Sequence, residues 1–137
     1  MGRITVEVSV AHNQQVLQAR SGSGDPEGFQ TVAVAGVIDT GAARLVLPER
    51  IASALRLIHA GETTVRYADQ RTAVRSMVSN VWLSLEGREG VFSAIVEPDR
   101  DTALIGAIVL EELDLVVDCT RQVVYPRDPH GIISEVE

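Results

Sequence analysis

The chain has 137 residues, of which 45% are hydrophobic and 23% charged, and this balance indicates one globular domain with its own core. Its formal net charge is −7, from 12 basic and 19 acidic residues, which argues against a nucleic-acid-binding surface. Every basic residue is an arginine, so Schiff-base chemistry, a Ser-Lys dyad and a P-loop lysine are all excluded.

Cysteine content and hydropathy indicate the compartment. Cys119 is the one cysteine, which excludes an intrachain disulfide and favours a reducing environment. We expect its thiol to be packed rather than nucleophilic, because no histidine accompanies it in a motif. Residues 1–7 carry charge where a signal peptide would be apolar, and no apolar run reaches the roughly 18 residues that cross a bilayer. The sequence predicts a soluble cytoplasmic protein without a membrane partner.

Alternating hydrophobic residues predict a half-buried strand at the start of the chain. They are Ile4, Val6, Val8 and Val10. Residues 14–20 are expected to form either a second strand or an irregular connection, and residues 21–28 a turn-rich loop. The elements expected next are a buried strand at 29–38, a short strand at 44–47 and a short helix that begins at Pro48 and ends before Gly61.

The second half of the chain predicts short strands joined by tight turns. Residues 62–68 and 71–85 indicate a hairpin around Asp69-Gln70, and Trp82 is expected in the core or an interface. The expected elements after it are a turn at 87–90, a strand at 91–96, a charged loop at 97–101, a strand at 104–106, a helix to 113 that packs through Ile108, Leu110 and Leu113, and strands at 115–118 and 121–125. This spacing predicts an all-β barrel or sandwich with two small helices.

Two segments carry the chemistry. In Val37-Ile38-Asp39-Thr40-Gly41-Ala42 a β-favouring pair delivers an acid into a tight turn. A carboxylate placed directly after a buried strand is costly to desolvate, so it usually has a partner or a function. Gly41 lacks the Cβ that would block a close approach of another chain. The second segment, Leu104-Ile105-Gly106, is apolar, ends in glycine and leads into the second helix.

These parts, in this order, resemble the retropepsin-like aspartic proteases, the single-domain retroviral-type peptidases and their cellular and bacterial relatives. The similarity runs from about Gly28 to Pro126. It implies a single domain over 1–137, with a core at about 28–126, an N-terminal strand and loop at 1–27, and a tail at 127–137. The implied fold is an all-β, closed acid-protease barrel with one or two short helices.

The resemblance also assigns roles. Asp39 becomes the catalytic acid, and Thr40 braces the turn against a partner chain. The implied supporting residues of the active site are Thr40, Gly41, Ala42, Leu104, Ile105 and Gly106. A serine in place of Ala42 would donate a hydrogen bond to the ionised acid and favour its charged form. The alanine therefore predicts an activity optimum at a less acidic pH than that of a homologue with serine at this position. The hairpin residues Tyr67, Ala68, Asp69 and Gln70 occupy the position of the substrate-covering flap, where Tyr67 either covers the cleft or packs.

Aspartic proteolysis needs two carboxylates that share a proton and hold a water between them. The sequence contains one Asp-Thr-Gly, and Asp101-Thr102-Ala103 lacks the glycine. The second acid must therefore come from a second copy across a two-fold axis. The prediction is a homodimeric aspartic endopeptidase that acts on a peptide or protein substrate. No cofactor and no metal are expected, because His12, His59 and His130 are widely separated.

Three other interpretations stay open. Asp39 could simply cap a turn, as aspartate commonly does. The domain could be a catalytically silent module that binds peptides or dimerises. It could also be a peptidase with a single protein client.

Overall fold

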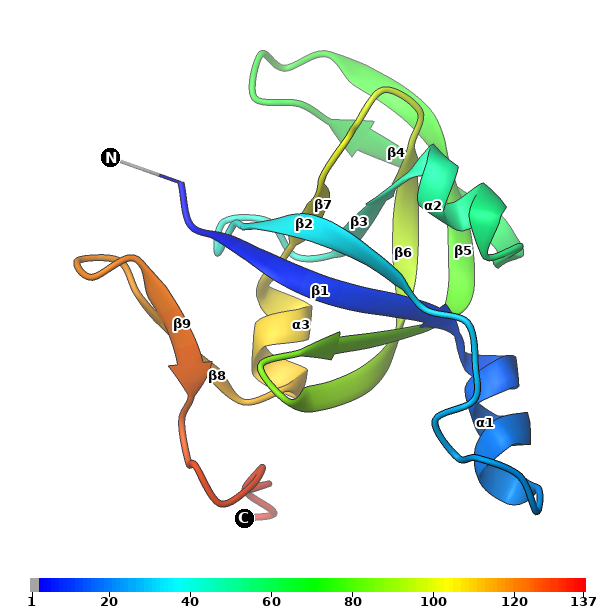
Figure 1. The fold of residues 1–137 in the computed structure, drawn as a ribbon. Helices are drawn as coiled ribbons and strands as arrows, with labels where there is room; N and C mark the ends of the chain where they lie inside the picture. Colours follow the sequence, from blue (N-terminus) through cyan, green and yellow to red (C-terminus); the bar gives the residue numbers. More distant parts are fainter. Residues whose placement is uncertain (1–2) are drawn as a thin grey trace.

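The computed structural model describes residues 3–137, and its strands follow the β-branched, alternating segments of the sequence (Figure 1). Within these residues the elements are β1 (Thr5–His12), α1 (Asn13–Ser21), β2 (Val32–Ile38), β3 (Leu45–Pro48), α2 (Glu49–Ala54), β4 (Ile58–Arg66), β5 (Thr72–Leu85), β6 (Arg88–Glu97), β7 (Ala103–Ile105), α3 (Ala107–Glu112), β8 (Leu115–Asp118) and β9 (Val123–Pro126). No helix in residues 3–137 combines the length and apolar character that crossing a bilayer requires.

Six strands of the described chain close into a barrel in the order β1-β2-β7-β3-β6-β5. Closure occurs because β1 pairs with β2 along its first part and with β5 along its last part. The pairs β2–β7 and β3–β6 are parallel, and β4 adds to the outside of β5. The prediction of an all-β, closed barrel is confirmed in its coarser part, because the described residues are mostly strand and form a closed barrel. They contain three helices, however, and not the predicted one or two. The barrel includes β1, which lies before residue 28.

The long strand β5 bends, so that its first part belongs to the β4–β5 hairpin and its last part to the barrel. A bulge interrupts its pairing with β6 between Val78 and Val81, and Asn80 there has a φ of 58°. Asparagine tolerates this left-handed conformation better than most residues, and a bulge increases local twist. The segment before the bulge continues into the β4–β5 hairpin, whereas the segment after it closes the barrel against β1.

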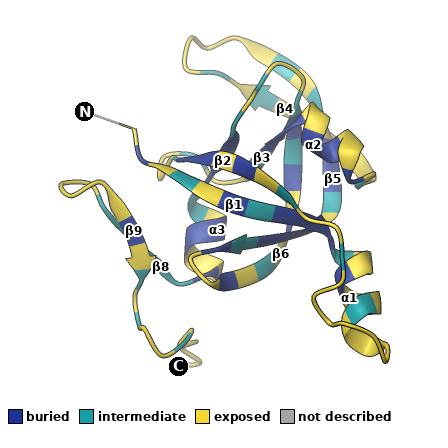
Figure 2. Cartoon of the chain, in the orientation of Figure 1, coloured by how far each residue is buried: buried dark blue, intermediate teal, exposed yellow. Residues whose placement is uncertain are grey.

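Buried aliphatic residues of the strands form the core of the barrel. Figure 2 shows buried residues, in dark blue, along the strands of the barrel. The fully buried ones include Val8, Val10, Leu45, Leu47, Leu83, Leu85 and Ile105. Leu110 and Leu113 are buried as predicted, but Ile108 is 51% exposed, so its assignment to the core was wrong. The short helix α3 turns that residue outward. Trp82 is buried, as expected.

The segment 14–20 is a helix, neither a strand nor an irregular connection. His12 caps α1, because its Nδ1 accepts a hydrogen bond from the Gln14 backbone N–H at 3.1 Å. The helix buries Val16 in a small cluster with Ala11 and Trp82, on which Phe29 packs. Gln, Leu and Ala favour a helix. The prediction failed because histidine is not among the usual N-cap residues.

Other boundaries differ by a few residues. Pro48 is the N-cap of α2, and β4 begins already at Ile58. The turn between β5 and β6 is Glu86-Gly87, not residues 87–90. Both residues have positive φ, 53° and 74°, as a two-residue type I′ turn requires. Arg88 therefore already belongs to β6.

The strands β8 and β9 form a separate two-stranded sheet beside the barrel (Figure 1). The turn of this hairpin is closed by the Arg121 backbone N–H, which donates to Asp118 Oδ1 at 3.0 Å. Cys119 lies exposed in this turn, so the expectation of a packed thiol was wrong. The prediction failed because a β-hairpin turn projects its residues into solvent whatever their hydrophobicity.

Candidate active site

The end of β2 places Asp39 on the surface in a turn that is closed by its own carboxylate. Asp39 is exposed, and its Oδ1 accepts the Gly41 backbone N–H at 3.0 Å. The Asp39 carbonyl accepts the Ala42 backbone N–H at 3.2 Å. A Cβ on residue 41 would meet Asp39 Oδ1 at 3.3 Å, so the glycine gives the carboxylate its room. The side chain of Asp39 is thus oriented by the turn and still open to solvent.

The segment 104–106 fixes the backbone of this turn through strand pairing and one hydrogen bond. β2 and β7 pair in parallel, with Val37 opposite Leu104, and the Asp39 backbone N–H donates to the Ile105 carbonyl at 3.0 Å. Ile105 is fully buried. Gly36, which the sequence analysis did not single out, makes space for it, because a Cβ there would approach Ile105 Cγ1 to 3.0 Å.

The start of α3 fixes the far side of the turn. The backbone N–H groups of Ala107 and Ile108 donate to the carbonyls of Ala42 and Ala43 at 2.8 and 3.0 Å. This crossing requires Gly106, whose Cβ would lie 2.4 Å from the Arg44 carbonyl oxygen. The structure thus brings together the two segments that the sequence singled out. Thr40 is exposed on the same turn, with its side chain accessible.

The β4–β5 hairpin carries the residues expected in the flap. Its tip is not the two-residue Asp69-Gln70 turn that the sequence suggested. The Gln70 backbone N–H donates to the Tyr67 carbonyl at 2.9 Å, and the Tyr67 N–H donates to the Arg71 carbonyl at 2.8 Å. Gln70 has a φ of 72°. This is a wider loop in which Gln70 takes the left-handed position that usually belongs to glycine.

Tyr67 joins the hairpin to the barrel. Its hydroxyl donates to Glu97 Oε2 at 2.7 Å, and Arg75 Nε donates to Glu97 Oε1 at 2.6 Å. The hydrogen bond to Glu97 raises the pKa of the Tyr67 hydroxyl, and burial raises it further. The same carboxylate, through its hydrogen bond, raises the pKa of Arg75. Neither Glu97 nor Arg75 was predicted from the sequence, because Glu97 stands in a charged stretch that is typical of a solvated loop.

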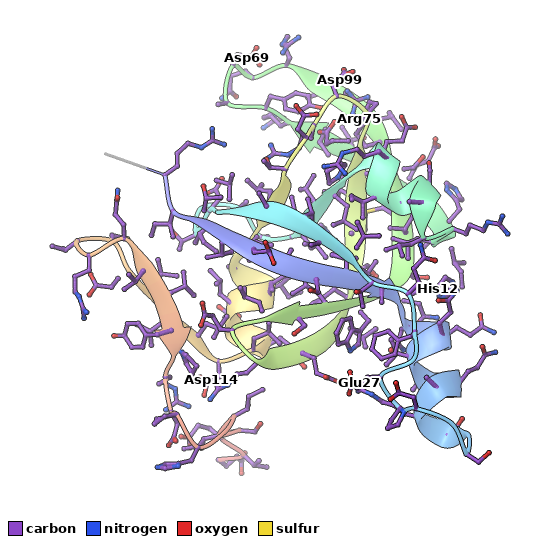
Figure 3. The ribbon with its side chains drawn as sticks, in the orientation of Figure 1. His12, Glu27, Asp69, Arg75, Asp99 and Asp114 are labelled. Atoms are coloured by element: carbon purple, nitrogen blue, oxygen red, sulfur yellow. The ribbon has the colours of Figure 1, made fainter. Side chains whose placement is uncertain are left out.

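A pocket of about 520 Å³ opens between this hairpin and the β6–β7 loop. Arginine side chains from both segments line it, and its acidic side chains come from the end of β6 and the loop after it. Figure 3 shows Asp69, Arg75 and Asp99 gathered at this end of the molecule. Its lining residues are Tyr67, Arg71, Thr72, Ala73, Arg75, Glu97, Asp99 and Arg100. Ala68, Asp69 and Gln70 form the exposed tip above it.

Comparison of the chain with models of protein families and with curated proteins finds no match.

Proposed function

We propose that the protein is a retropepsin-like aspartic endopeptidase that is active as a homodimer. The observation that carries the proposal is the Asp39 turn. The carboxylate of Asp39 is exposed, and its backbone N–H donates to the Ile105 carbonyl. The first N–H groups of α3 donate to the carbonyls that follow in the same turn. Such a fixed, accessible acid suits a group that must meet a second carboxylate at short range.

In the proposed mechanism two Asp39 carboxylates share one proton across a two-fold axis. Like charges at close range cannot both ionise, so one group stays protonated while the other is a carboxylate. The carboxylate accepts a proton from a bound water, which attacks the scissile carbonyl carbon. The protonated partner donates to the carbonyl oxygen. Collapse of the tetrahedral intermediate breaks the C–N bond, and the leaving nitrogen takes the proton that the first carboxyl received from water. A hydroxyl proton of the intermediate returns to the partner carboxylate, which restores the starting pair.

The β8–β9 hairpin supports association of two copies. Within the described residues both of its edges are unpaired, and an unpaired edge readily accepts another strand. Val123 and Tyr125 on β9 are partly exposed. In Figure 1 this hairpin and the turn after β2 lie toward the same side of the molecule. In the proposed dimer, a two-fold contact on that side joins the two acid turns and leaves the β4–β5 hairpin uncovered.

A subunit-mixing assay tests both parts of the proposal. Asp39→Asn alone is expected to lower peptide cleavage by at least about 1,000-fold. Adding an equal amount of this variant to the wild type, with time for subunit exchange, should reduce cleavage to about half, because random pairing halves the number of dimers with two acids. Undiminished cleavage in the mixture contradicts a shared site, and equal cleavage by both pure proteins contradicts catalysis by Asp39.

The alternative is a catalytically silent module of the same fold. The exposed hairpin tip, with Gln70 in place of glycine, is the observation that favours it. Binding of peptides by wild type and Asp39→Asn with equal affinity, and cleavage by neither, supports the module. A screen against total cell protein, in addition to short peptides, separates the module from a peptidase with one client.

A further inference from the structure

The outer part of the β4–β5 hairpin extends beyond the barrel. β5 pairs with β6 only from Met77 onwards, and β4 pairs with β5. Among the residues that the structure describes, 62–74 therefore have no sheet neighbour outside the hairpin itself, which arches away from the barrel in Figure 1. A two-stranded hairpin is marginally stable on its own. The angle between the β4–β5 hairpin and the barrel therefore depends on side-chain contacts.

Glu97 supplies such contacts from the barrel. It is the last residue of β6 and lies opposite Pro48 of β3, so its backbone is fixed by the sheet. One carboxylate oxygen accepts the Tyr67 hydroxyl at 2.7 Å and the other accepts Arg75 Nε at 2.6 Å. The Arg75 Nε also lies 3.2 Å from the Tyr67 hydroxyl. The three groups form a closed triangle between the hairpin tip, the hairpin base and the barrel.

We infer that Glu97 is a positioning residue that holds the β4–β5 hairpin over the adjoining pocket through Tyr67 and Arg75. Opening of the hairpin then requires the bond between Tyr67 and Glu97 to break. This inference rests on the proposed function and on the flap role that the resemblance implies for the hairpin, which is to cover the bound peptide and exclude water. Glu97 thereby sets how rigidly the hairpin is held, although it does not touch the reacting atoms.

Burial distinguishes this contact from an ordinary surface ion pair. The side chain of Glu97 is 13% exposed and that of Arg75 is 27% exposed. Hydrogen bonds to a largely buried carboxylate are strong, and losing a donor leaves the charge poorly satisfied. The nearby pair of Arg71 and Asp69 is different. Both members belong to the hairpin tip and are more than half exposed, so that pair leaves the hairpin angle free.

The test measures hairpin motion directly, by ¹⁵N relaxation of the backbone amides of residues 66–71. In the wild type we expect order parameters of about 0.85, the value of a rigid backbone. Tyr67→Phe removes one hydroxyl and keeps the ring, and should lower these values to below about 0.6. Glu97→Gln keeps the shape of the side chain and removes its charge, and should lower them as well. The control is Glu89→Gln, the same change in an ion pair on the side of the barrel that carries α1.

Each result decides the inference. Rigid tip amides in Tyr67→Phe overturn it, and wild-type values in Glu97→Gln overturn the assignment to that carboxylate. Equal loss of order in Glu89→Gln shows a general softening and also overturns it. In a cleavage assay Tyr67→Phe and Glu97→Gln should each raise KM several-fold and leave kcat within about twofold, because Asp39 is untouched. If the wild type cleaves no substrate, the proposed function fails, and the relaxation data still decide the role of Glu97.

Discussion

Gly106 lies where α3 crosses the acid turn, and the backbone there passes too closely for any side chain. A Cβ at this position would approach the Arg44 carbonyl oxygen to 2.4 Å and the Ala43 carbonyl carbon to 2.8 Å. These are backbone atoms, so they cannot move aside as the end of a flexible side chain would. The position of Asp39 therefore depends on a glycine that is 67 residues away in the sequence (106 − 39).

Replacing Gly106 with alanine should destabilise the protein by about 3 kcal/mol, because the backbone must shift to admit the methyl group. Equilibrium unfolding in urea measures the effect. The matched control is Gly24→Ala in the loop after α1, where a Cβ would have no neighbour within 4 Å and φ is ordinary. That variant should stay within about 0.5 kcal/mol of the wild type. Equal stabilities of the two variants would show that the turn can yield.

At the scale of elements, α1 is attached to the barrel, among the described residues, by a small hydrophobic cluster and the ion pair between Arg20 and Glu89. The Phe29 and Trp82 rings meet edge to face with their centroids 5.2 Å apart. Arg20 binds both carboxylate oxygens of Glu89 on β6. The Arg20 guanidinium lowers the pKa of the Glu89 carboxyl, and burial opposes this effect. The helix is therefore held partly by a charge that acid can remove.

The attachment of α1 should weaken in acid. Because the folded-state pKa of Glu89 lies below its ordinary value of 4.5, the stabilisation is complete above that pH and is lost as the pH falls through the lowered pKa. Trp82 is the one tryptophan, so its fluorescence reports the attachment. We expect a red shift below about pH 4.5 in the wild type. In Glu89→Gln this transition should be missing, and an identical transition there would exclude the ion pair as its cause.

Local sequence pattern explains why some elements were predictable and others were not. The strands follow from β-branched alternation, and the acid turn follows from a compact motif between Ile38 and Ala42. The helix α1 could not be predicted from local pattern, because its cap is a histidine and its buried face is completed by Phe29, which follows it in the chain. Glu97 was missed for a similar reason. Its partner Tyr67 lies 30 residues earlier, and only the folded barrel brings them together.

At the scale of the whole molecule, Arg88 connects the barrel to the C-terminal hairpin. It is 9% exposed, and its Nη1 donates to the carbonyls of Leu113 and Asp114 at 3.0 and 2.9 Å. Its Nη2 donates to the Asp128 carbonyl. Arg127 adds a bidentate pair with Asp114, which lowers the pKa of that carboxyl. The orientation of the β8–β9 hairpin, and with it the proposed dimer contact, depends on this buried guanidinium.

Arg88→Met removes the guanidinium and leaves an unbranched, apolar side chain in the place of the arginine's methylene stem. We expect a loss of about 2–3 kcal/mol in unfolding free energy, because buried carbonyls lose a charged donor. Sedimentation equilibrium should also show weaker self-association, since the hairpin loses its fixed angle. Arg121→Met, at the exposed tip of the same hairpin, controls for the change in net charge. Dimerisation that is lost equally in both variants would point to charge rather than orientation.

The bonds between α3 and the acid turn have a consequence for synthesis of the chain. Asp39 is synthesised before Ala107 and Ile108, whose N–H groups fix its turn. A nascent or truncated polypeptide that stops before these residues contains Asp-Thr-Gly without the backbone that orients it. Under the proposed function, hydrolysis cannot begin until these residues have been synthesised and folded, and a product that stops before them is inactive.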